Sequence, residues 1–151
     1  MKLTFLSVGK NRSEFFSPAI AEYAQRLSHM AHVQFMELRE SRAPDVQAKE
    51  EEGATLISKV PPRDELVAVD RQGQALSSKD FALWLGRQRD AARNVTFAIG
   101  GDGGLAERVL TKSKLVLSLS QMTFPHRLAR LILVEQVYRA FTILRGIPYH
   151  K

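Results

Sequence analysis

One stretch near the C-terminus, residues 115–145, limits the possible folds more than any other part of the chain. It begins with an apolar run typical of a buried strand, residues 115–119, and continues through a loop that ends at Pro125. A long helix is predicted over residues 127–145, with Thr123 as a suitable N-cap, because proline is tolerated in a helix only in its first turn. Where a strand leads so quickly into a helix, free backbone N–H groups lie above the strand end and can face a ligand.

The predicted helix is apolar on nearly every side. A surface helix carries one apolar stripe, whereas a helix that is apolar all round is buried on more than one face. We therefore expect one face to pack against a sheet and another to pack against a second copy of the chain in a homodimer. A central core helix in a monomer is the alternative. The residues that define this pattern are Leu128, Leu131, Ile132, Leu133, Val134, Val137, Tyr138, Ala140, Phe141, Ile143 and Leu144.

Predicted strands alternate with predicted helices along the whole chain. The strands are expected at Lys2–Val8, His32–Leu38, 65–70, Asn94–Ile99 and 115–119. The helices are expected at 13–27, 46–59, 78–92, 105–113 and 127–145. No repeat or linker interrupts this order, so residues 1–151 are predicted to form a single α/β domain. We expect a mainly parallel sheet of about five strands, with helices on both faces and with ligands at the carboxyl ends of the strands.

Two shorter patterns give local predictions. Ser77, followed three residues later by Asp80, resembles the start of a helix with a capping box. Residues 71–73 (Arg-Gln-Gly) are expected to form a turn that ends the third strand. The residues expected to face inward on the helix after Ser77 are Phe81, Leu83, Trp84 and Leu85.

The chain carries a net charge of +6, and the excess positive charge lies in its C-terminal third. Residues 1–99 carry 14 lysines and arginines against 13 acidic residues, whereas residues 100–151 carry 8 against 3. A polyanion, with nucleic acid first, is the natural partner for such a distribution. A basic protein that is merely soluble is the alternative.

The composition excludes several other classes. The chain has no cysteine, so disulfides and thiolate chemistry are excluded. It has no apolar run of about 18 residues and no signal-peptide pattern, which predicts no membrane segment and a cytoplasmic location. His29 and His32 lack further ligands nearby, so no metal site is predicted.

A glycine-rich loop follows the predicted strand Asn94–Ile99. The pattern Gly101-x-Gly103-x-x-Ala106 matches the dinucleotide-binding fingerprint, but the acidic residue that would hold the ribose is missing at the end of the next strand. In dinucleotide-binding folds the fingerprint also follows the first strand, so nicotinamide or flavin binding is disfavoured. Four glycines still let the backbone approach a ligand closely. A glycine-rich turn without a ligand is the alternative.

Two histidines lie in the basic part of the chain. His126 lies at the predicted helix start beside two arginines, where its protonation is disfavoured, and it can bind a substrate or serve only in packing. His150 follows Tyr149 in a tail that can close over a base and a phosphate if it is ordered, although a disordered tail fits the same composition. Glu135 and Arg139 are four residues apart and are expected to form an intrahelical ion pair.

Several motifs, taken together, resemble the bacterial ribosomal large-subunit methyltransferase H family, the minimal members of the SPOUT superfamily. They are the glycine loop 99–105 (IGGDGGL), the stretch 117–126 (LSLSQMTFPH), the helix segment 135–140 (EQVYRA) and the terminal residues 148–150 (PYH). Residues 8–10 (VGK) and 21–23 (AEY) also match, so the resemblance spans the whole chain.

The resemblance implies a SPOUT fold with a C-terminal deep trefoil knot, an obligate homodimer, and S-adenosyl-L-methionine as the methyl donor. It also implies methylation of a pseudouridine at N3 in the 23S ribosomal RNA of the assembled ribosome. Many relatives have leucine at the position of Val69, which preserves an apolar wall, and relatives vary at Asp102, to which no role is assigned. By motif matching, the cofactor-binding residues are Val69, Gly100, Leu119, Ser120, Gln121, Met122, Thr123 and Phe124.

The chemistry of the expected reaction indicates which residues act on the substrate. Methyl transfer needs in-line alignment of the donor and the nucleophile, and the pseudouridine N3 must lose a proton. No general base is identifiable. Two other functions stay open: a ribosome-associated RNA-binding factor without catalysis, and a SPOUT methyltransferase that acts on transfer RNA. We expect substrate positioning and stabilisation of the anion from His126, Arg130, Arg139, Tyr149 and His150.

Overall fold

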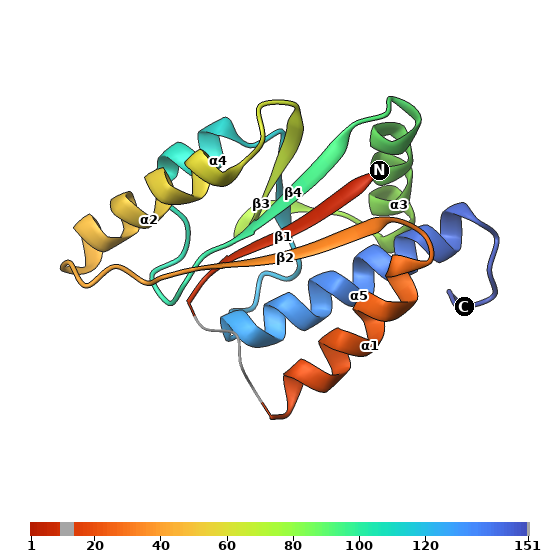
Figure 1. The fold of residues 1–151 in the computed structure, drawn as a ribbon, viewed down its shortest axis with the longest axis horizontal. Coiled ribbons are helices and arrows are strands. Elements are labelled where there is room, and N and C mark those ends of the chain that lie inside the picture. Colours follow the sequence, from red (N-terminus) through yellow and green to blue (C-terminus); the bar gives the residue numbers. More distant parts are fainter. Residues whose placement is uncertain (10–13, 151) are drawn as a thin grey trace.

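The structure is a computed structural model that describes residues 1–9 and 14–150, and its centre is a parallel sheet (Figure 1). The strands are β1 (Lys2–Val8), β2 (His32–Leu38), β3 (Asp64–Ala75), β4 (Asn94–Ile99) and β5 (Leu115–Ser118). They lie in the order β2-β1-β4-β3-β5, and every neighbouring pair is parallel. The predicted sheet is therefore confirmed. The trefoil knot stays a prediction, because strand order does not define how a chain is threaded.

Helices cover both faces of this sheet, as expected when all strands are parallel. They are α1 (Phe16–Ser28), α2 (Asp45–Lys59), α3 (Ser78–Asp90), α4 (Glu107–Lys112) and α5 (His126–Leu144). Helices α1, α3 and α5 pack over one face, and α2 and α4 pack over the other. Ser13, the predicted start of the first helix, lies outside the described residues, as do Lys10 and Lys151.

The larger core lies beneath α1, α3 and α5. Its centre is a group of aromatic rings in which Phe5 stacks on Phe97, with ring centroids 5.3 Å apart. Phe81 of α3 meets Phe97 edge-on at 6.4 Å, and all three side chains are almost completely buried. The next residue along β4, Ala98, faces the smaller core under α2 and α4, because successive strand residues point to opposite faces. Burial of these large rings fixes α3 over the sheet.

Helix α5 lies between α1 and α3 on the same face of the sheet (Figure 1). It approaches α3 so closely that a side chain at Gly86 would meet Leu144 at 2.8 Å. The sheet and two flanking helices bury half of the apolar residues of α5, and the other half, among them Leu128 and Ile132, are half-buried. Packing within one chain thus accounts for the buried half of the apolar pattern, and the pattern by itself does not show a second subunit. The homodimer stays a prediction that rests on the family resemblance.

The start of α5 differs from the expectation. The N-cap is Pro125, which has an extended ψ of 140° and makes no side-chain cap hydrogen bond. The assignment of Thr123 as the N-cap is wrong. Proline keeps the residue before it out of the helical conformation, so the helix cannot reach back to Thr123. The first backbone N–H groups of α5 are left without a side-chain acceptor.

Strand β3 continues past its predicted end. The turn expected at residues 71–73 is wrong, because β3 runs through them and its pairing with β5 shifts register between Val69 and Gln74. The intervening residues form a bulge that leaves the ladder. A side chain at Gly73 would meet the Val116 carbonyl oxygen at 2.5 Å, so only glycine lets the strand rejoin β5 here.

Helix α3 confirms its predicted start and corrects one predicted core residue. The Ser77 hydroxyl accepts the Asp80 backbone N–H at 3.1 Å, which is the expected N-cap. Leu85 is fully buried, whereas Leu83 is 59% exposed. The expectation that Leu83 faces inward is wrong, because it lies outside the stripe that Phe81 and Leu85 form at i and i+4.

We expect the two leucines of α3 to differ sharply in their contribution to stability. Leu85→Ala empties a fully buried site and should lower the free energy of unfolding by about 2–5 kcal/mol. Leu83→Ala removes the same atoms from an exposed site and should change it by less than about 0.5 kcal/mol. Chemical denaturation of both variants measures the two values, and equal destabilisation would contradict this orientation of α3.

Candidate active site

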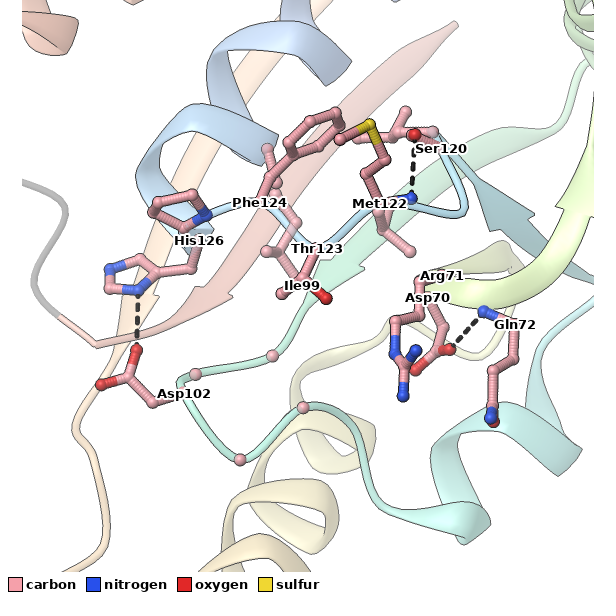
Figure 2. Close-up of a pocket in the computed structure, with 18 of the residues that line it drawn as sticks. Asp70, Arg71, Gln72, Ile99, Asp102, Ser120, Met122, Thr123, Phe124 and His126 are labelled. Atoms are coloured by element: carbon pink, nitrogen blue, oxygen red, sulfur yellow. Dashed lines mark hydrogen bonds and ion pairs between the residues drawn. The ribbon is translucent and has the colours of Figure 1, made fainter.

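The carboxyl ends of three adjacent strands, β4, β3 and β5, surround a pocket of about 630 Å³. Val69 and Ile99 line it from β3 and β4, and the loop between β5 and α5 lines another side (Figure 2). The three strand ends that we expect to bind ligands are thus brought together. All the predicted cofactor-binding residues except Gln121 line this pocket, and the side chain of Gln121 is exposed.

The glycine loop after β4 turns back on itself beside the pocket. Gly101 and Gly104 form an antiparallel bridge, in which the Gly104 N–H donates to the Gly101 carbonyl at 3.0 Å. A Cβ at Gly100 would lie 2.5 Å from the Gly104 backbone, so this position admits only glycine. At Gly103 a Cβ would meet nothing within 4 Å. This turn differs from a dinucleotide site, where the glycine loop leads directly into a helix.

The loop between β5 and α5 presents apolar side chains beside backbone polar groups. Leu119 and Phe124 are half-buried, while Met122 is 73% exposed. The Ser120 hydroxyl accepts the Met122 N–H at 3.0 Å and holds the loop in a local turn. A wall of this kind suits a flat ring with an apolar face and polar edges, such as a nucleobase.

His126, at the start of α5, and Asp102, in the glycine loop, face each other beside the pocket (Figure 2). His126 Nδ1 lies 3.3 Å from an Asp102 carboxylate oxygen. The histidine side chain is mostly buried, and its Nε2 has no hydrogen-bond partner among the described residues. Asp102, to which the sequence assigns no role, therefore ties the glycine loop to the start of α5.

Three polar residues that line the pocket are not predicted from the sequence. They are Lys49 of α2, and Arg71 and Gln72 of the β3 bulge. The Gln72 N–H donates to the Asp70 carboxylate at 2.8 Å, which orders the bulge. From the sequence, Arg71 and Gln72 belong to an ordinary surface turn. The signal that could have found them is Gly73, because an isolated glycine inside a strand pattern often marks a bulge.

Arg130, one turn into α5, does not line the pocket. It is buried, and its guanidinium donates to Glu37 at 3.1 Å and lies 4.8 Å from the centre of the Phe35 ring. Both partners belong to β2, at the opposite edge of the sheet from β5. Arg130 thus joins α5 to an edge strand, and of the five residues predicted to act on the substrate, His126 alone lines the pocket.

Arg139, Tyr149 and His150 form a separate cluster at the other end of α5. The Tyr149 hydroxyl donates to Glu135 at 2.9 Å and lies 3.3 Å from the Tyr23 hydroxyl. Arg139 donates to the same carboxylate at 3.0 Å, which confirms the predicted ion pair, and lies 3.5 Å from His150 Nδ1. Burial, together with the hydrogen bonds to Tyr23 and Glu135, raises the pKa of the Tyr149 phenol well above its usual range. The tail is therefore docked on its own chain.

Neither a metal cluster nor a membrane helix is found in the part of the chain that the structure describes. No three His, Cys, Asp or Glu side chains are grouped there so that they could hold a metal ion. No helix among those residues is long and apolar enough to cross a membrane.

Known proteins resemble this chain in sequence and in fold. The family model for predicted SPOUT methyltransferases matches residues 1–150. Two proteins named ribosomal RNA large subunit methyltransferase H, from Anaeromyxobacter sp. strain Fw109-5 and strain K, are 45% and 46% identical to it, each over 100% of both chains. A solved methylase family protein from Neisseria gonorrhoeae has a TM-score of 0.51 and 9% identity, and the match covers 99% of this chain and 95% of that one.

The solved structure supports the fold alone, because its sequence identity is low. The matches in sequence extend over the full length of the chain and include the glycine loop and the loop before α5. The chain therefore belongs to the ribosomal RNA large subunit methyltransferase H family of SPOUT methyltransferases.

Proposed function

We propose that the protein transfers a methyl group from S-adenosyl-L-methionine to N3 of a pseudouridine in 23S ribosomal RNA, on the assembled ribosome. The observation that carries the proposal is the pocket, where a glycine loop and an apolar wall meet at the ends of three adjacent strands. The names of the relatives point the reaction toward ribosomal RNA. The positive charge of residues 100–151 and the expected cytoplasmic location agree with a ribosomal substrate.

The pocket fits S-adenosyl-L-methionine in size and in chemistry. Its volume of about 630 Å³ is typical of a small-molecule site. Leu119 and Phe124 supply an apolar wall for the adenine, and Gly100 lines the pocket with its backbone alone. Val69, Ser120, Met122 and Thr123 complete the lining near these residues. When bound, the cofactor supplies a methyl group activated by a sulfonium.

The residues of the chain must orient the base and favour loss of its N3 proton. N3 becomes nucleophilic only when it is deprotonated, and a nearby hydrogen-bond donor or cation stabilises the resulting anion. His126 lines the pocket and is our candidate for this task, and the contact with Asp102 orients its ring. Arg139, Tyr149 and His150 offer a second set of suitable groups.

The two sets lie far apart within one chain. His126 and Arg139 are separated by 13 residues of α5, which is about 20 Å along a helix axis. One base cannot contact both sets in a single chain. For both to act together, the tail cluster of one copy must lie beside the pocket of a second copy, and the proposed homodimer allows this arrangement.

Methyl transfer from labelled S-adenosyl-L-methionine to ribosomes that lack the modification tests the proposal, with free ribosomal RNA and bulk transfer RNA assayed in parallel. We expect label only in the large-subunit RNA of ribosomes, and mass spectrometry of the nucleosides should place it on N3 of pseudouridine. Label in transfer RNA would support methyl transfer but show that the proposed substrate is wrong. Ribosome binding without transfer of label would favour a non-catalytic factor.

Glycine substitutions test whether the loop after β4 holds the cofactor. Gly100→Ala puts a Cβ 2.5 Å from backbone atoms, which forces the loop to move. Overpacking of this kind should weaken S-adenosyl-L-methionine binding about tenfold or more. Gly103→Ala adds the same methyl group where no protein atom lies within 4 Å, and should weaken binding far less. Calorimetry measures both affinities. A larger loss of affinity for Gly103→Ala than for Gly100→Ala would contradict the placement of the cofactor at Gly100.

Two further substitutions separate a role in the reaction from a role in the fold. His150→Ala should lower the rate of methyl transfer about tenfold or more and leave the melting temperature unchanged. Arg130→Ala removes a buried cation from Glu37 and Phe35 and should lower the free energy of unfolding by about 1–3 kcal/mol. If both variants methylate ribosomes at the wild-type rate, neither residue positions the substrate.

A further inference from the structure

Two cationic side chains at the pocket have no part in the proposed chemistry: Lys49 of α2 and Arg71 of β3. Within residues 1–9 and 14–150, neither has a carboxylate oxygen within 4.0 Å. The three glutamates that follow Lys49 on α2 bind elsewhere. Glu50 pairs with Arg108 at 3.0 Å, and the next two glutamates accept hydrogen bonds from Ser41. Two carboxylates also line the pocket, but Asp70 accepts the Gln72 N–H and Asp102 faces His126. Neither lies within 4.0 Å of the two cationic groups.

The β3 bulge holds the backbone of Arg71 in place while its side chain stays exposed. The Ser118 hydroxyl donates to the Arg71 carbonyl at 3.1 Å, and the Asp70 carboxylate accepts the following backbone N–H at 2.8 Å. Figure 2 shows Arg71 beside Asp70 and Gln72, across the pocket from His126. A bulge next to an active site commonly re-aims a side chain, and here it directs a guanidinium to the rim of the pocket.

A guanidinium and an ammonium in one pocket can together bind an anion. In the proposed reaction, two kinds of anion come near this pocket. The cofactor carries a carboxylate, which would lie inside the pocket. RNA carries phosphates, and a base that enters the pocket brings the phosphates on either side of it to the rim. The exposure of Arg71 favours the phosphate, because a planar guanidinium can bind two phosphate oxygens at once.

We propose that Arg71, together with Lys49, binds a backbone phosphate of the RNA next to the methylated nucleotide and so holds the base over the cofactor. This inference rests on the proposed function, which names RNA as the substrate. Both side chains are positioning residues, since they touch the backbone of the substrate and not the reacting atoms.

The test compares Arg71→Ala and Lys49→Ala, alone and combined, with two matched controls. Arg87→Ala and Lys79→Ala remove the same charges from exposed positions of α3 that do not line the pocket. Three experiments are made on the full chain. Sedimentation measures binding to unmodified ribosomes at several salt concentrations, steady-state kinetics gives kcat and KM for methyl transfer, and calorimetry gives the S-adenosyl-L-methionine affinity.

Arg71→Ala should weaken ribosome binding about tenfold and reduce the slope of log affinity against log salt by about 0.7, as expected for one lost phosphate contact on a single strand. KM should rise by more than kcat falls, and the affinity for the cofactor should not change. Arg71→Lys should restore the salt dependence but not the full affinity, because an ammonium cannot bind two oxygens in the planar geometry of a guanidinium. The salt slope of the double variant should fall by about twice as much, as expected for two lost phosphate contacts.

Equal salt slopes and KM values for Arg71→Ala and Arg87→Ala would overturn the inference. A fall in cofactor affinity with unchanged ribosome binding would also overturn it and assign the anion to the cofactor carboxylate. Ribosome binding is measured without methyl transfer, so a wild-type protein that binds ribosomes but transfers no methyl group would refute the proposed function alone.

Discussion

The strand order β2-β1-β4-β3-β5 is the constraint on which the site depends. In a parallel sheet all carboxyl ends lie at one edge, and the position of β5 beside β3 brings three loops together there. The glycine loop leaves β4, which is buried between the two cores, so it starts from a rigid point. At the first position of that loop, Gly100, the backbone passes so close to Gly104 that there is no room for a Cβ atom. The order and pairing of the strands therefore determine the shape of the pocket.

Helix α5 connects this pocket to the rest of the molecule. Its first residue, His126, faces the glycine loop, and Glu135, at its middle, accepts a hydrogen bond from Tyr149 of the docked tail. Between its two ends the helix is packed on the sheet, α1 and α3. A single rigid element thus sets the spacing between two groups of polar side chains. In the proposed homodimer, that spacing would determine how one copy must lie on the other.

Most of the fold could be predicted from the sequence because the strands are short, apolar and separated by clear helix signals. The limits of β1, β2 and β4 match the prediction residue for residue. The errors lie where a tertiary contact decides the local structure. The bulge at residues 71–73 depends on the fit of Gly73 against Val116, which lies more than 40 positions away in the chain. The orientation of Leu83 depends on which side of α3 meets the sheet.

The candidate site divides in the same way. The glycine loop and the loop before α5 have recognisable residue patterns, and the structure places both at one pocket. Lys49 and Arg71 have no such pattern, because an isolated lysine or arginine is usually a solvated surface residue. Only the arrangement of α2 and of the bulge around the strand ends brings these charges together. Arg130 shows the opposite case, since its place in a basic segment suggests RNA while its actual partners are Glu37 and Phe35.

The bulge in β3 also separates two demands on the same strand. The ladder residues on either side, Val69 and Gln74, must keep their register with β5, and Gly73 must stay small for the strand to return. Of the residues that leave the ladder, Asp70 orders the bulge by accepting the Gln72 N–H, whereas the side chains of Arg71 and Gln72 are exposed. Substitutions at Arg71 and Gln72 can accumulate without disturbing the sheet. Under the proposal that Arg71 binds the RNA backbone, the preference of the protein for its RNA surroundings can therefore evolve, or be redesigned, independently of the fold.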